Sequence, residues 1–170
     1  MRINTASKNI LCKILERKRH DEPWQEDIDL EDMLKDILKR ANTFVPSDSG
    51  SILLDDPALK VSGRPSELLW FVACYGKGSY KIAGAPLKSG SGIAGRTYTS
   101  GKPYISKSVK EDTRWNPAID KKTKFRTESI ICAPIKVKGS TVGVIELINK
   151  KGSINYDQRD LTLLRIFAEY

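Results

Sequence analysis

Hydrophobic residues alternate with polar ones in two neighbouring runs of the C-terminal half, which predicts a pair of strands. The runs are Ser129 to Lys136 and Thr141 to Asn149, both rich in Ile and Val, and Gly139 lies in the short segment between them. Branched residues fit a pleated, half-buried surface, and a short loop with a glycine favours a hairpin. Pro134 lacks a backbone donor, so we expect irregular pairing there.

One acidic residue falls on the apolar side of the second run. Strand side chains alternate between faces, so one face carries Val142, Val144, Glu146 and Ile148. A carboxylate on an apolar face is costly unless it is paired. Two interpretations of Glu146 stay open: an acid at a rim or bonded to a backbone amide, and a contact with a ligand inside a pocket.

Helical periodicity marks three further segments. Asp29 to Ala41 and Asn155 to Tyr170 each place apolar residues on one face, which is typical of helices packed on a core. Ile3 to Lys18 carries a shorter stripe. It is either a linker helix resting on the domain or part of a dimer seam, because fewer than three heptads do not establish a coiled coil.

Between these helices the pattern predicts short strands joined by loops. The expected strands are Ser51 to Leu54, Leu68 to Tyr75, Tyr80 to Ile82 and Tyr104 to Ser106. Val109 to Lys124 is a long polar connection, and such a loop in a compact domain is usually a lid, a binding segment or disordered. Its Trp115 either covers a pocket or anchors the loop.

The order of elements predicts an α+β domain with an antiparallel sheet. We expect residues 1–23 to form an N-terminal helix or linker and residues 24–170 to form one domain. The helical pattern is still running at Tyr170. We therefore expect the last helix to be truncated and the chain to be a fragment of a larger signalling protein.

Charge and composition narrow the classes of partner and the location expected for the protein. The net charge is +8, but residues 1–20 hold six Lys/Arg and one Glu, and residues 21–36 hold eight Asp/Glu and one Lys. Residues 102–126 are basic again. Alternating blocks of this kind favour solvated surface charge over specific nucleic-acid binding. No apolar run approaches the length of a membrane span, and no apolar secretory segment begins the chain, so the expected location is cytoplasmic.

The sequence lacks a convincing set of catalytic residues, which predicts that the chain is not an enzyme. His20 is the only histidine and lies in a poorly organised segment, so a His-based triad lacks a convincing base. Gly90 to Gly95 spells GxGxxG. Only a short helix follows it, so the dinucleotide-fold context is missing. We interpret it as a turn into a helix whose exposed N–H groups face an anion.

Several motifs fall in an order that resembles GAF domains. They are Gly92 to Gly95, Gly101 to Pro103, Asp120 to Thr127, Arg126 to Ile135 and Gly143 to Lys150. The Asp-x-x-Thr-x-Phe-Arg-Thr segment within them is most similar to the branch found in cyclic-nucleotide phosphodiesterases and adenylyl cyclases. The resemblance implies a GAF-like central antiparallel sheet, with terminal helices on one face and a loop-covered pocket on the other.

The resemblance also implies a site and partners. Relatives that bind a cyclic nucleotide, cAMP or cGMP, use positions that look like Ser51, Ile93, Ala94, Thr123, Thr127 and Glu146. We add Trp115 to these ligand-binding residues, because it can cover the pocket. One turn of helix would place the hydroxyls of Thr123 and Thr127 on one side. Such domains commonly form homodimers through their terminal helices and pass a signal to an output domain.

Two departures from that branch concern recognition of the base and the segment after the hairpin, where the final acid of the branch's Asn-Lys…Phe-x-x-x-Asp-Glu signature is replaced by Leu161. Where binders have an aromatic residue followed by Asp, this chain has Cys74-Tyr75, which weakens the expected purine contacts. The pair Lys150 and Asp160 survives and is interpreted as a structural tie. The leading hypothesis is a sensory module that binds a small molecule; the alternative is a ligand-free dimerisation or interaction domain.

Overall fold

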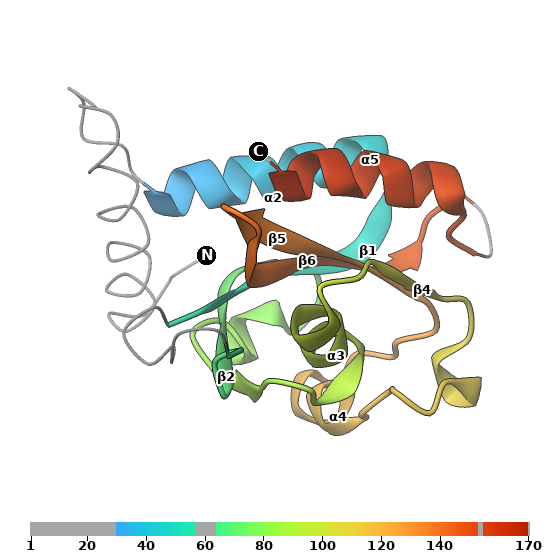
Figure 1. The fold of residues 1–170 in the computed structure, drawn as a ribbon. Helices are drawn as coiled ribbons and strands as arrows, with labels where there is room; N and C mark the ends of the chain where they lie inside the picture. Colours follow the sequence, from blue (N-terminus) through green and yellow to red (C-terminus); the bar gives the residue numbers. More distant parts are fainter. Residues whose placement is uncertain (1–29, 57–63, 153–154, 170) are drawn as a thin grey trace.

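The computed structural model describes residues 30–56, 64–152 and 155–169, which form a mixed domain of helices and one sheet (Figure 1). The elements are α2 (Leu30–Phe44), β1 (Ser47–Asp55), β2 (Leu68–Tyr75), the 3-10 turn η1 (Ser79–Lys81), β3 (Pro86–Lys88), α3 (Gly92–Ser100), β4 (Tyr104–Ser106), the 3-10 turn η2 (Val109–Glu111), α4 (Ala118–Thr123), β5 (Ile130–Val137), β6 (Ser140–Lys150) and α5 (Gln158–Glu169). The predicted fold class is confirmed. The expected helix over Ile3 to Lys18 lies outside the described residues.

The sheet has six strands in the order β3-β2-β1-β6-β5-β4, with every neighbouring pair antiparallel. The predicted hairpin forms β5 and β6. The irregular pairing expected at Pro134 lies one residue further on: Pro134 itself pairs in register with Val144, and the register shifts between Ile135 and Lys136. Strand β4 reaches only as far as Cys132. One side of β5 is therefore a free edge at Pro134, where a missing donor breaks no ladder bond.

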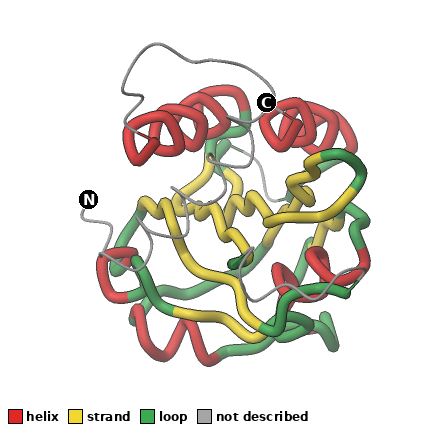
Figure 2. Tube along the Cα trace, turned by 60° about the vertical axis from the view of Figure 1, so that its left-hand side comes forward, coloured by secondary structure: helices red, strands yellow, loops and turns green. Residues whose placement is uncertain are grey.

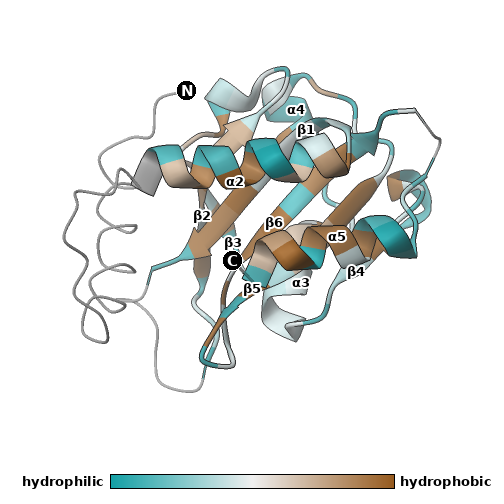
Figure 3. Ribbon diagram, turned by 90° about the horizontal axis from the view of Figure 1, so that it is seen from above, coloured by the Kyte–Doolittle hydropathy of each residue, from teal (hydrophilic) through white to brown (hydrophobic). Residues whose placement is uncertain are grey.

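Helices cover both faces of this sheet. Figures 1 and 2 show α2 and α5 on one face and α3 and α4 on the other. Seen from above, α2 and α5 lie side by side over strands that are mostly hydrophobic (Figure 3). Side chains alternate along β6 as predicted: Ile145 and Leu147 belong to the cluster under α2 and α5, whereas Val144 belongs to the cluster on the opposite face.

A buried ion pair joins the end of β6 to the start of α5. Lys150 Nζ lies 2.6 Å from Asp160 Oδ2, and the two side chains are 15% and 9% exposed. Asp160 Oδ2 also accepts a hydrogen bond from the Asp157 N–H, and Asp157 Oδ1 accepts from the N–H groups of Arg159 and Asp160. These reciprocal bonds satisfy first-turn donors of α5. The Lys150–Asp160 tie that the resemblance implied is thus present.

One expectation for the middle of the chain, the strand at Tyr80 to Ile82, was wrong. Residues around Tyr80 form the 3-10 turn η1 in place of a strand. Gly76, Gly78 and Gly84 have φ of 99°, 77° and 76°, and this left-handed backbone, which glycine adopts readily, coils the chain. The segment from Val109 to Lys124 is an ordered connection that contains η2 and α4. Strand β3 was not predicted at all. No helix among the described residues is long and apolar enough to cross a membrane.

Candidate ligand pocket

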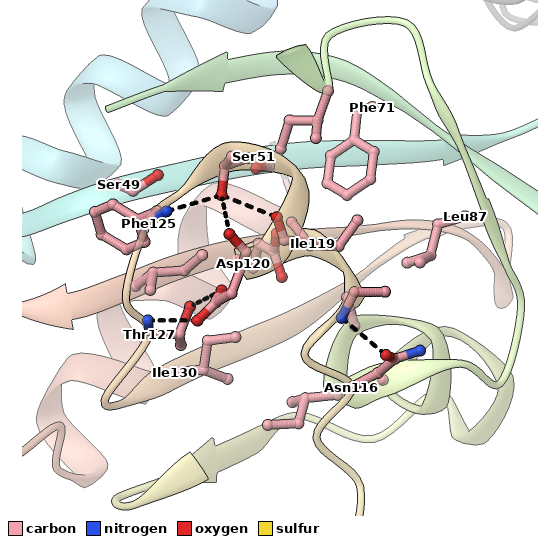
Figure 4. Close-up of a pocket in the computed structure, with 18 of the residues that line it drawn as sticks. Ser49, Ser51, Phe71, Leu87, Asn116, Ile119, Asp120, Phe125, Thr127 and Ile130 are labelled. Carbon is pink, nitrogen blue, oxygen red and sulfur yellow. Dashed lines mark hydrogen bonds between the residues drawn. The ribbon is translucent and has the colours of Figure 1, made fainter. Parts of the chain in front are cut away.

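A pocket lies between the sheet face opposite α2 and α5 and the elements α3 and α4 (Figure 4). It encloses about 90 Å³. The residues proposed from the sequence and the resemblance all line it: Ser51, Ile93, Ala94, Trp115, Thr123, Thr127 and Glu146. The fold therefore brings together side chains from β1, α3, α4, the segment around α4 and β6.

The floor of the pocket contains a buried polar pair. Ser51 on β1 and Glu146 on β6 are cross-strand partners, and they are 2% and 6% exposed. Burial raises the pKa of Glu146 from 4.5 to about 7, the hydrogen bond with Ser51 lowers it, and the charge of Asp120 raises it. Glu146 is thus buried, bonded to a side-chain hydroxyl and part of the pocket lining. It lies neither at a rim nor, among the described residues, on a backbone amide, and its contact with a ligand stays a prediction.

The first turn of α3 forms one wall. Ile93 and Ala94 are 3% and 6% exposed and line the pocket. The first N–H groups of a helix have no partner within it. No side chain caps α3 at Ser91. The Ser91 hydroxyl oxygen accepts a hydrogen bond from Asn116 Nδ2 at 3.0 Å instead. This wall therefore offers backbone donors and the positive end of a helix dipole.

The segment around α4 covers the opening and ties its own polar groups together. Thr123 ends α4, and its hydroxyl donates to the Ile119 carbonyl at 2.9 Å. Thr127 lies outside the helix, so the expectation that one helical turn holds both threonines was wrong. Lys124 has φ of 56°, which ends the helix in a left-handed residue and turns the chain before Thr127.

Asp120 is a charged pocket residue that was not predicted from the sequence. It lines the pocket, and its carboxylate accepts hydrogen bonds from the Thr127 hydroxyl at 2.6 Å and the Thr127 N–H at 2.7 Å (Figure 4). The available signal was its place as the first residue of the Asp-x-x-Thr segment. We call the covering segment from Trp115 to Phe125 the lid. Asp120 and Glu146 thus give the pocket two carboxylates, one on the lid and one on the floor.

Three aromatic residues, Trp115, Tyr75 and Phe71, take different positions relative to the pocket. Trp115 is half-buried, lines the pocket and packs against the apolar cluster beneath it, so it both covers the pocket and anchors its loop. Cys74 is buried on the pocket side, whereas the Tyr75 hydroxyl donates to Asn42 Oδ1 at 2.7 Å and its ring packs under α2. The aromatic surface on the floor is Phe71 from β2.

The buried thiols are unsuited to chemistry. Burial raises the pKa of Cys74 to about 12, despite a hydrogen bond with Ser51, and burial also raises the pKa of Cys132 well above its usual value. A thiolate is the reactive form of cysteine, so these side chains act as small apolar groups. No cluster of three or more potential metal-ligating side chains occurs in the described ranges.

Comparisons with known proteins agree with this geometry. The profile of the GAF domain family matches residues 27–170. A probable 3′,5′-cyclic phosphodiesterase of Caenorhabditis elegans is 34% identical over 79 residues, which are 46% of this chain and 11% of that protein. A dual 3′,5′-cyclic-AMP and -GMP phosphodiesterase of Drosophila melanogaster is 35% identical over 82 residues, which are 48% of this chain and 5% of that protein.

Solved structures share the fold. The GAF domain of a phosphoenolpyruvate-protein phosphotransferase from Coxiella burnetii superposes with a TM-score of 0.68 at 17% identity, covering 97% of this chain and 90% of that one. A methyl-accepting chemotaxis protein gives a TM-score of 0.67 at 22% identity, covering 97% and 91%. The chain spans a small part of the phosphodiesterases that it matches. From the family profile and the architecture together, it belongs to the GAF domain family.

Proposed function

We propose that this domain is a non-catalytic sensory module that binds a purine cyclic nucleotide, cAMP or cGMP, and passes the signal to an output domain of a larger protein. The observation that carries the proposal is that one wall of the pocket presents hydrogen-bond donors and the facing side presents acceptors. The first turn of α3 presents backbone donors at Ile93 and Ala94. Asp120 and Glu146 present carboxylate acceptors across the same space.

A cyclic nucleotide has the matching polarity. Its anionic phosphate suits the N-terminal end of α3, and the N–H groups of its purine edge suit Glu146 and the Ser51 hydroxyl on the floor. Phe71 and Ile82 offer the apolar surface on which a base would lie. Two of the relatives are named for hydrolysis of cyclic nucleotides, which supports the same ligand class.

The lid has to move for such a ligand to enter. The enclosed space is about 90 Å³, whereas pockets for drug-sized ligands measure about 300–1,000 Å³. Asn116 joins the lid to the start of α3 through its exposed side-chain bond to Ser91. An outward shift of Trp115 to Phe125 would open the space while the sheet and α3 stay fixed. The closed and open lid positions provide two states that a ligand can shift.

Calorimetric titration of cGMP and cAMP into the purified chain tests the proposal. We expect saturable binding of one of them and a rise in melting temperature with ligand concentration. The linear nucleotide 5′-GMP, which lacks the cyclic phosphate, should bind more weakly. The absence of both heat and thermal shift at millimolar cyclic nucleotide would exclude this ligand class.

Ser51→Ala provides the matched test of the floor. Removing this hydroxyl takes away a partner of Glu146 and should weaken cyclic-nucleotide binding about tenfold, the effect of one lost hydrogen bond to a charged group. Thr43→Val removes a hydroxyl from the exposed surface of α2 and should leave the affinity unchanged. Equal affinities of both variants and the wild type would place the ligand away from the floor.

A ligand-free role in dimerisation is supported by a separate observation. Large apolar side chains are exposed on the outer helices, with Phe44 60% and Ile166 52% exposed. If this surface joins two copies, sedimentation should give a dimer, and Ile166→Glu should give a folded monomer. A monomer at high micromolar concentration for the wild type would contradict dimerisation through α2 and α5.

A further inference from the structure

A second cavity lies on the other side of α3, between the C-terminal half of this helix and β4. Its volume is about 430 Å³, and it shares only Ile93 with the ligand pocket. This volume falls within the range of small-molecule sites, about 300–1,000 Å³. Helix α3 therefore separates two cavities, one beside its first turn and one beside its last turns.

The lining of the second cavity is strongly basic. Arg96, Lys102 and Arg114 line it and are exposed, and within the described residues none of the three forms an ion pair. Thr99 and Ser100 add hydroxyl groups to the same lining. Three cations around one cavity raise its positive potential and attract anions.

One of these cations is held in place. The Arg114 guanidinium lies 4.1 Å from the centre of the Tyr104 ring, a position that the ring's negative face stabilises. The Tyr104 hydroxyl donates to Asp112 Oδ2 at 2.7 Å, and the backbone N–H of Arg114 donates to Asp112 Oδ1 at 2.9 Å. Asp112 thereby orients the loop. Its negative charge offsets part of the positive charge of Arg114 and leaves that of Arg96 and Lys102.

The C-terminal end of α3 would by itself repel an anion, but two carbonyl groups in its C-terminal half accept hydrogen bonds. The Thr97 carbonyl accepts the Gly101 N–H at 3.0 Å and the Ser100 hydroxyl at 3.4 Å. The Arg96 carbonyl accepts the Thr99 hydroxyl at 3.2 Å. In the described part of the chain, the lining of this cavity carries three basic side chains and no acidic one, so its net charge is positive.

We propose that the cavity formed by α3, β4 and Arg114 is an anion site for a small phosphorylated molecule that carries a phosphate monoester or a diphosphate group. A planar guanidinium matches two phosphate oxygens at once, and Arg96 and Arg114 supply two guanidinium groups to one cavity. Lys102 adds a third positive charge. The site takes a more highly charged anion than a cyclic phosphodiester, so its ligand differs from that of the first pocket.

Pyrophosphate is the probe for this site. We titrate it into the ¹⁵N-labelled full chain at constant ionic strength and follow backbone amide shifts. Saturable shifts should concentrate in residues 96–104 and at Arg114, with smaller changes at Thr127 in the first pocket. Citrate, an anion of comparable charge without phosphate geometry, should bind several-fold more weakly.

Charge-removing variants give the decisive comparison. Arg96→Gln and Lys102→Gln should each weaken pyrophosphate binding about tenfold, as expected for a lost charge-assisted hydrogen bond. Lys39→Gln removes the same charge from the exposed face of α2 and should leave binding unchanged. Circular dichroism melting confirms that each variant is folded.

Three outcomes would overturn the site. Equal losses in all variants would mean a general effect of net charge, and equal affinity for citrate would mean that phosphate geometry is not recognised. Shifts concentrated around Thr127 would assign pyrophosphate to the first pocket. Because the test uses no cyclic nucleotide and different residues, its failure leaves the proposed function of the first pocket intact, and the reverse also holds.

Discussion

Replacing Asp160 with alanine should lower the free energy of unfolding by about 3–5 kcal/mol, the usual cost of breaking a buried ion pair. Lys150 Nζ lies 2.6 Å from Asp160 Oδ2, and its side chain is only 15% exposed. The substitution would leave this ammonium group largely buried without its partner. It would also remove the acceptor for the Asp157 N–H at the start of α5.

Urea unfolding of the wild type and of Asp160→Ala at neutral pH measures the difference in their free energies of unfolding. Glu128→Gln is the matched control, because the Arg126–Glu128 pair at 3.2 Å has side chains 73% and 63% exposed. Exposed pairs contribute about 0.2–1 kcal/mol, so this variant should unfold almost like the wild type. If Asp160→Ala cost no more than Glu128→Gln, the tie between β6 and α5 would be energetically unimportant.

The parts of the fold that the sequence predicted well are those governed by one local rule. Strands β5 and β6 follow from alternation, since each residue faces opposite to its neighbour, and the apolar spacing along residues 29–41 and 155–170 corresponds to α2 and α5. Strand β2 has the predicted bounds Leu68–Tyr75. In each case side-chain burial and backbone propensity favour the same conformation.

The missed elements depend on contacts that no short pattern encodes. Strand β3 is only Pro86–Lys88 and exists by pairing with Leu68 to Trp70. The lid conformation depends on Lys124, a non-glycine residue with φ of 56°, which nothing in its side chain indicates. This residue turns Thr127 back toward Asp120, so the carboxylate that organises the lid was visible only in three dimensions.

Candidate site residues were predicted better than their environment. The resemblance named residues that line one pocket, but it gave no information about how polar groups inside that pocket are satisfied. Ser51 and Glu146 became partners because β1 and β6 pair in a particular register. The protonation of Glu146 then depends on burial and on Asp120, which α4 brings to the pocket.

The stability of the domain should therefore fall as the pH rises from 5 to about 7, and Glu146→Gln should remove most of this dependence. Burial raises the pKa of Glu146 from 4.5 to about 7. Between these values the folded domain keeps a proton that the unfolded chain has already lost. Unfolding then releases a proton, so a rise in pH favours the unfolded state up to about pH 7 and has no further effect above it.

The size of the effect follows from the shift in the pKa of Glu146. One pH unit corresponds to about 1.36 kcal/mol, so the raised pKa makes the wild type about 3 kcal/mol less stable at pH 8 than at low pH. Glutamine keeps the shape and cannot ionise. Urea unfolding should therefore give similar free energies for wild type and Glu146→Gln near pH 5 and a more stable variant at pH 8. The comparison cancels every other titrating group, because both proteins share them. Parallel stability curves across this range would mean that Glu146 is solvated and that the lid does not close over the pocket floor.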